Sequence, residues 1–236
     1  MLGFPVLSFD FSLLLSGQYR DALVAGFVLS LQLTAVTLVL AVPLATTVAM
    51  LRLSPSRLLR AIGVSYVEAI RNVPLLAHML FWYFGAPEML PEALKQRLYA
   101  TNIEAISAVM ALTLYTAAFM AEDIRSGIRA VPPGQMEASR ALGLGFLQSM
   151  QLVILPQAVR ITVPPLISQT LNLWKNTSIA TVIGVAEMMY RAAQVESATF
   201  RSVEAFAFAT AAYLTISLTI TGLASWYQHR FPVRSR

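Results

Sequence analysis

Long uncharged stretches alternate along this chain with short segments that hold most of its charged residues. The clearest stretch, Ala22–Leu51, contains no charged residue at all. A charge near the centre of a bilayer costs about 2.5–3.5 kcal/mol on insertion scales, and about 20 apolar residues are needed to cross. The pattern therefore predicts an all-α, polytopic membrane protein with five transmembrane helices, at about 22–51, 60–86, 104–122, 158–175 and 205–228.

Composition supports this prediction. Hydrophobic residues make up 57% of the chain and charged residues 12%, about half of what soluble domains carry. This balance disfavours a disordered chain, a secreted disulfide scaffold and a soluble nucleic-acid binder. The chain has no cysteine, which excludes zinc–thiolate sites and thiol nucleophiles. We expect one transmembrane domain over residues 1–236.

Two segments do not follow the simple pattern. Ala141–Val159 is uncharged, but Gly143, Gly145 and Pro156 make it a poor lipid-facing helix, so we expect a non-spanning helical loop. Met1–Gln18 lacks the basic start and the cleavage site of a signal peptide, so we expect it to be retained at the membrane interface.

The charged loops predict an orientation. With five spans, one side collects ten arginines against three acidic residues, and the other side collects six basic against eight acidic residues. Lysine and arginine in short loops stay in the cytoplasm. The N-terminus is therefore expected outside and the C-terminus inside, and the basic pI needs no nucleic-acid partner to explain it.

The loop after the third span combines turn and helix signals. Pro132, Pro133 and Gly134 form a turn that stops the preceding helix, and Gln135–Leu142 can then form two helical turns. Gly143 suits the left-handed position after a helix end. A second helix is expected until Pro156. Such a loop can be a rigid knob that docks into a partner, or an ordinary amphipathic connector.

The same loop carries a motif. Glu137-Ala138-Ser139, Gly143 and Val153-Ile154-Leu155-Pro156 stand at the spacing found in permease subunits of binding-protein-dependent ABC importers, which this chain resembles. Ser139 replaces an alanine and Val153 an isoleucine of the family pattern. The resemblance implies that the loop is a cytoplasmic coupling helix between spans three and four. It also implies that the ATPase-coupling residues are Glu137, Ala138, Ser139, Gly143, Leu155 and Pro156.

Flanking segments narrow the resemblance to the polar amino acid branch, and within it to glutamate/aspartate permeases. They include Arg71-Asn-Val-Pro-Leu-Leu, Phe81-Trp-Tyr-Phe and Asn172-Leu-Trp-Lys-Asn-Thr-Ser. The family implies an ATP-binding subunit dimer, a second permease subunit (homo- or heterodimer), a periplasmic solute-binding protein and a bacterial cytoplasmic membrane as partners and location. A permease for glutamine, arginine or histidine is the alternative. The chain has no P-loop, so we expect it to bind no cofactor and a separate subunit to use the ATP.

Polar residues within the expected spans are candidates for a substrate path, because they are costly in lipid. Glu68 and Arg71 lie three apart, and they can form an ion pair or leave Arg71 and Asn72 to meet a substrate carboxylate. Pro164-Pro165 is expected to break the fourth span. Lys175, Asn176 and Thr177 follow it, and Lys175 can contact a carboxylate or snorkel to the interface.

Two other function classes fit less well. A membrane hydrolase needs a nucleophile with its base, and the chain has no Gly-x-Ser-x-Gly. A passive channel has no need of a docking helix in the cytoplasm. His78 has no ligand companions in the sequence, so no metal site is expected.

Overall fold

The computed structural model describes residues 11–12 and 17–231, and most of the Met1–Gln18 segment lies outside the described residues. The described chain folds into helices joined by short turns. In order they are α2 (Gly17–Leu53), α3 (Arg57–Arg71), α4 (Leu75–Leu80), the π-helix η1 (Phe81–Gly85), the 3₁₀ helix η2 (Ala86–Met89), α5 (Glu92–Tyr99), α6 (Ile103–Arg129), α7 (Pro133–Ala141), α8 (Phe146–Ser149), the π-helix η3 (Met150–Ile154), α9 (Leu155–Asn176), the 3₁₀ helix η4 (Thr177–Ile183), α10 (Met188–Thr199) and α11 (Ser202–Arg230).

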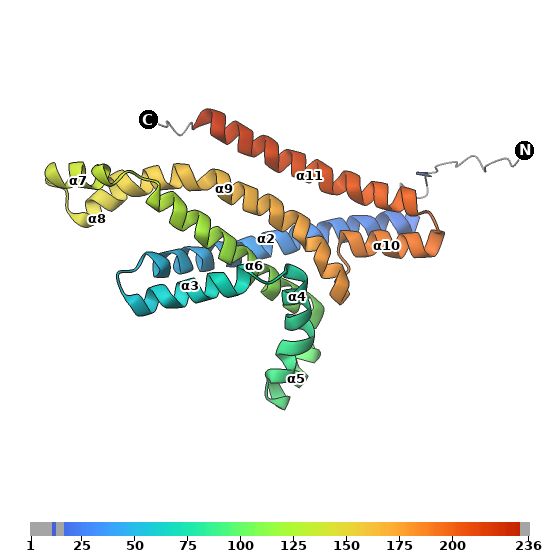
Figure 1. The fold of residues 1–236 in the computed structure, drawn as a ribbon. Helices are drawn as coiled ribbons and strands as arrows, with labels where there is room; N and C mark the ends of the chain where they lie inside the picture. Colours follow the sequence, from blue (N-terminus) through green and yellow to red (C-terminus); the bar gives the residue numbers. More distant parts are fainter. Residues whose placement is uncertain (1–10, 13–16, 232–236) are drawn as a thin grey trace, which may run out of the picture.

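Long helices form the body of the molecule. In Figure 1, α9 and α11 run lengthwise between α7 and α8 at one end and α10 at the other, α2 runs below them, and α6 crosses α2 obliquely. The segment from α4 to α5 branches away to the side. Within the described residues, four helical segments are long and apolar enough to cross a membrane: Gly17–Leu53, Ile103–Arg129, Phe146–Ile183 and Ser202–Arg230. The predicted all-α membrane fold is confirmed.

The segment expected to be the second span is not one continuous helix. α3 ends at Arg71, and α4 begins after Pro74, which stands at its N-cap with φ −58° and ψ 142°. Proline disfavours helical geometry in the residue before it and donates no N–H, so the chain turns between Asn72 and Pro74. Residues 60–86 are therefore divided between α3 and the segment that runs from α4 through η1 to the start of η2, and this segment departs from the direction of α3 (Figure 1).

The expected helix end at Pro156 was wrong. The helix passes from α8 through η3 into α9, with Pro156 in the first turn of α9. At the end of η3 the Leu155 N–H donates to the Met150 carbonyl, five residues back. This wider turn relieves the clash that a proline ring has with the preceding helical turn. The non-spanning loop expected over Ala141–Val159 consequently ends earlier, and its second half is continuous with a long helix.

The expected break at Pro164-Pro165 was also wrong, because both prolines lie inside α9. Prolines are tolerated in membrane helices where neighbouring helices support the freed backbone, and α9 packs against both α6 and α11. The interruption falls instead at Thr177, where α9 gives way to η4.

The core is centred on α6, whose small residues let its neighbours approach closely. Ala111, Ala117 and Ala121 of α6 are fully buried. A Cβ atom on Gly127 would lie 1.9 Å from Thr162 Oγ1 of α9, so any larger residue here would displace the Thr162 side chain. The close packing fixes α6 and α9 side by side. In the chain, α6 precedes the α7–α8 loop and α9 follows it.

Candidate functional site

The α7–α8 loop, here residues 131–154, contains the short helix and the left-handed turn that its sequence predicts, although Pro133 and Gly134, expected in the preceding turn, belong to α7. α7 starts with Pro133 in its first turn and ends at Ala141. Gly143 has φ +86°, as expected for the left-handed position. The Leu144 N–H donates to the Ser139 carbonyl (3.2 Å), and the Gly143 N–H to the Arg140 carbonyl (3.0 Å). This pair of bonds is the Schellman motif, which stops the helix and turns the chain.

The loop presents one face outward. Glu137, Ala138 and Gly143 are exposed, whereas Ser139 is buried and its hydroxyl donates to the Met136 carbonyl (2.8 Å). Three apolar side chains near the turn are strongly exposed: Leu142 (83%), Leu147 (71%) and Phe146 (62%). A cluster of exposed apolar residues this close together is typical of a contact surface for another protein.

The base of the loop is anchored. Val131, Ile154 and Ala158 are buried together and hold the ends of α6 and α9 against each other. Leu155 and Pro156 belong to the first turn of α9 and are exposed on its other side. Of the predicted coupling residues, the structure thus places Glu137, Ala138 and Gly143 on the surface of the loop, and Leu155 and Pro156 at its base.

A cleft of about 410 Å³ lies between α6 and α9. α9 contributes Gln169, Asn172, Leu173, Lys175 and Asn176, and α6 contributes Tyr115, Thr116 and Phe119. Two predicted path residues, Lys175 and Asn176, therefore lie in its wall. Thr177 does not, because it is fully buried and its hydroxyl donates to the Trp174 carbonyl (2.8 Å).

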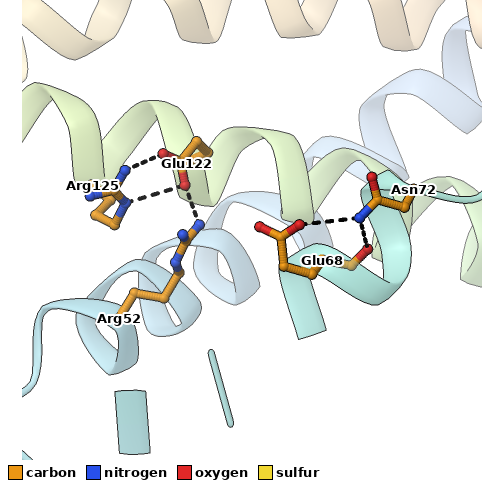
Figure 2. A network of polar contacts seen from close by, with 5 residues as sticks. All are labelled: Arg52, Glu68, Asn72, Glu122 and Arg125. Carbon is orange, nitrogen blue, oxygen red and sulfur yellow. Dashed lines mark hydrogen bonds and ion pairs between the residues drawn. The ribbon is translucent and has the colours of Figure 1, made fainter. Parts of the chain in front are cut away.

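The remaining predicted path residues lie near the end of α3. Glu68 does not pair with Arg71 in the described structure; instead the Asn72 Nδ2 donates to the Glu68 carboxylate (3.1 Å) and carbonyl (2.8 Å), as Figure 2 shows. The Arg71 guanidinium lies 4.9 Å from the centre of the Phe119 ring, a cation–π contact. Phe119 lines the cleft, so Arg71, which is itself exposed, contacts one of the residues of the cleft wall.

Acidic residues of α6 fasten it to both neighbours. The Glu122 carboxylate accepts from Arg52 of α2 and from Arg125 one turn along α6 (Figure 2). The adjacent Asp123 accepts from Gln169 Nε2 of α9 (3.0 Å). In the sequence, Glu122 and Asp123 are neighbouring acidic residues directly after an expected span, and this position is the signal for such contacts.

A second polar cluster was missed entirely. Glu187, placed by sequence analysis in an external loop, is fully buried at the start of α10. It accepts from the hydroxyls of Ser30 (3.1 Å), Tyr213 (2.8 Å) and Thr181, and from the Tyr190 N–H (2.9 Å). We call these four side chains, Ser30, Thr181, Glu187 and Tyr213, the Glu187 cluster. No basic partner appears at Glu187 within the described residues, and four donors satisfy its carboxylate.

Comparison with known proteins identifies the chain. The family model described as binding-protein-dependent transport system inner membrane component matches residues 14–232. The chain belongs to this family of transport permeases. The resemblance drawn from the loop motif is therefore confirmed.

Individual relatives agree with this assignment. The permease is 38% identical over 197 residues to the probable glutamine ABC transporter permease protein GlnM of Bacillus subtilis, with 83% of this chain and 87% of the relative covered. It is 36% identical over 200 residues to the glutamate/aspartate import permease protein GltJ of Escherichia coli K12, with 83% and 81% covered. A solved chain described as an amino acid ABC transporter with histidines superposes with a TM-score of 0.82 at 31% identity, covering 95% of the permease and 100% of that chain.

The geometry joins the two predicted sites of the permease. α6 and α9 form the walls of the cleft, and the same two helices run into the two ends of the α7–α8 loop (Figure 1). The loop is therefore continuous with α9, which carries Lys175 and Asn176, and with α6, which forms the facing wall of the cleft.

Proposed function

We propose that this permease is the transmembrane subunit of an ATP-driven importer for a polar amino acid, glutamate or aspartate. It receives the amino acid from a periplasmic binding protein and releases it into the cytoplasm. A separate ATP-binding subunit dimer supplies the energy, and a second permease subunit, identical or related, completes the path. This chain binds no cofactor of its own.

The observation that carries the proposal is that α6 and α9 connect an exposed loop to a polar cleft. The loop carries the family motif and leaves Leu142, Phe146 and Leu147 without cover. The cleft offers one cation, Lys175, together with the amides of Gln169, Asn172 and Asn176. An ammonium beside amides suits a substrate that carries both carboxylates and an amino group.

In this proposal Glu137, Ala138, Ser139 and Gly143 form the part of the α7–α8 loop that meets the ATPase. Leu155 and Pro156 pass its movement into α9. Lys175 and Asn176 meet the substrate, and Arg71, Asn72 and Glu68 shape the neighbouring wall through Phe119. The predicted orientation, with the N-terminus outside and the C-terminus inside, puts the α7–α8 loop in the cytoplasm, where ATP is bound.

The test is reconstitution of the permease in proteoliposomes with its ATPase and binding protein. Uptake and ATP turnover are measured against glutamate, aspartate, glutamine, arginine and histidine. We expect glutamate or aspartate to give the highest uptake, and Lys175→Met to reduce it at least tenfold, since one charge-assisted contact is worth about 1.5–3 kcal/mol. Arg20→Met, at the exposed start of α2, is the matched control and should leave uptake unchanged.

Glutamine is the second candidate, because one of the relatives is named as a probable glutamine permease. Higher uptake of glutamine than of glutamate in the same panel would establish it. A passive channel would conduct the amino acid without ATP, so uptake that persists in the absence of ATP would overturn the proposal.

A further inference from the structure

Asp123 contacts the cleft wall without lining it. It stands one helical turn beyond Phe119 on α6 and is half-buried. Its Oδ2 atom accepts a hydrogen bond from Gln169 Nε2 at 3.0 Å, and Gln169 lines the cleft. The bond joins α6 to the wall of the cleft that α9 provides.

This bond fixes which end of the Gln169 amide faces Asp123. A carboxylate accepts hydrogen bonds and donates none, so only the Nε2 end can point toward it. The Oε1 end is then directed to the other side, where Asn172 Nδ2 lies at 3.5 Å. Asn172 also lines the cleft. The carboxylate thus makes Gln169 present an acceptor, rather than a donor, beside the cleft.

We propose that Asp123 is a positioning residue that holds Gln169 as the acceptor for the α-ammonium group of the transported amino acid. The inference rests on the proposed function and deepens it, since Lys175 further along α9 recognises carboxylate and Gln169 recognises the amino end. It applies to every amino acid, because all of them carry the α-ammonium group.

A simple tie between α6 and α9 is the competing explanation. Close packing of Gly127 on Thr162 already joins these helices, as does the buried contact of Val131 with Ile154 and Ala158. A purely structural bond between the two helices would affect the binding of every ligand equally. A positioned acceptor supports only ligands that bring a free ammonium group, and this difference can be measured.

The experiment uses the permease–ATPase complex in lipid nanodiscs without the binding protein, so that affinity reports the cleft. Binding of radiolabelled glutamate is compared with competition by N-acetylglutamate, which lacks the α-ammonium group. If the uptake panel selects glutamine, glutamine and its N-acetyl derivative are used. The wild type should prefer the free amino acid.

Asp123→Asn can either donate to or accept from Gln169, so the amide is no longer fixed. We expect glutamate to bind roughly tenfold more weakly, the low end of the range for one hydrogen bond to a charged group, with no change for N-acetylglutamate. Gln169→Ala should reduce the preference for glutamate over N-acetylglutamate in the same way. Adding Asp123→Asn to Gln169→Ala should lower the affinity for glutamate by less than a further twofold, because the two changes remove the same interaction. Asp123→Glu keeps a carboxylate and should retain the preference.

Two variants serve as controls: Asp21→Asn removes the same charge at the exposed start of α2, and Ser126→Ala alters an exposed position on α6. Neither should change the preference. The inference would be overturned if Asp123→Asn weakened the binding of both ligands equally. It would also be overturned if the losses of glutamate affinity from Asp123→Asn and Gln169→Ala added in full in the double variant. Uptake by the wild-type complex tests the proposed function separately, so a wild type that imports glutamate while Asp123 fails these criteria refutes the inference alone.

Discussion

The two ends of the helical bundle treat their polar and apolar groups in opposite ways. At one end, the Glu187 cluster brings a fully buried carboxylate together with three hydroxyls and a backbone N–H from α2, η4, α10 and α11. At the other end, the α7–α8 loop leaves Leu142, Phe146 and Leu147 exposed. The Glu187 carboxylate is satisfied within the chain, whereas the apolar side chains of the α7–α8 loop are left uncovered by it.

The difference bears on the contact that we propose between the α7–α8 loop and the ATPase. Buried polar networks that are fully satisfied specify one arrangement, because breaking any bond leaves a group unpaired in a low dielectric. Exposed apolar residues on a short helix are stabilised by whatever covers them. We therefore expect substitutions in the Glu187 cluster to act on the stability of the permease itself, and substitutions in the α7–α8 loop to act on its assembly and coupling.

The largest effect is expected from Glu187→Ala. The change removes the acceptor of three hydroxyls and leaves a cavity, so the free energy of unfolding should fall by about 3 kcal/mol. Thermal unfolding in detergent micelles measures it. Glu92→Ala on α5, where the exposed carboxylate accepts from the exposed Gln96, should cost less than about 0.5 kcal/mol. Equal losses in the two variants would remove the contrast between the two ends.

The next effect is expected at Gly143. Its φ of +86° is strained for any residue with a Cβ, so Gly143→Ala should cost about 1–2 kcal/mol locally and distort the end of α7. In proteoliposomes we expect ATP hydrolysis to continue while uptake falls several-fold. Gly134→Ala is a matched control, because Gly134 has ordinary φ and no atom within 4 Å of an added Cβ. Uptake that falls equally in both variants would contradict a specific role for the turn.

A smaller effect on stability, with a clear effect on assembly, is expected from Leu142→Ser. The side chain is 83% exposed, so the free energy of unfolding of the isolated permease should change by less than about 0.5 kcal/mol. Loss of its burial in an interface should weaken co-purification with the ATPase about tenfold. Met89→Ser changes a residue that is 77% exposed in η2, and it should leave assembly intact. Normal assembly of Leu142→Ser would place the ATPase contact elsewhere.

The sequence predicted the α7–α8 loop better than it predicted the helices beside it. The end of α7 depends on local chemistry, because Gly143 can adopt positive φ and the residues that close the Schellman motif are near neighbours. The continuity of α9 depends on η3 and on the helices packed around it, and local signals at Pro156 and Pro164-Pro165 pointed to breaks that packing prevents.

The polar contacts show the same limit. Lys175 and Asn176 were predicted as path residues because they end an apolar span, and they lie in the cleft wall. Glu187 was assigned to a loop, since nothing near it in the sequence predicts hydrogen bonds with Ser30 or Tyr213. Contacts between distant segments arise only when the helices are placed, so charge counting along the chain could not find them.

The smallest effect is expected from Ser139→Ala, which restores the alanine of the family pattern. The buried hydroxyl donates to the Met136 carbonyl three residues back (2.8 Å), a bond that competes with helix formation. Alanine has the highest helix propensity and fills nearly the same volume. The free energy of unfolding should therefore change by less than about 0.5 kcal/mol, and the ratio of ATP hydrolysed to amino acid imported should stay within twofold of the wild type. Uncoupling in this variant would mean that the hydroxyl itself, and not the shape of α7, contributes to the proposed contact. The contrast between the Glu187 cluster and the α7–α8 loop would then have to include buried residues of the loop.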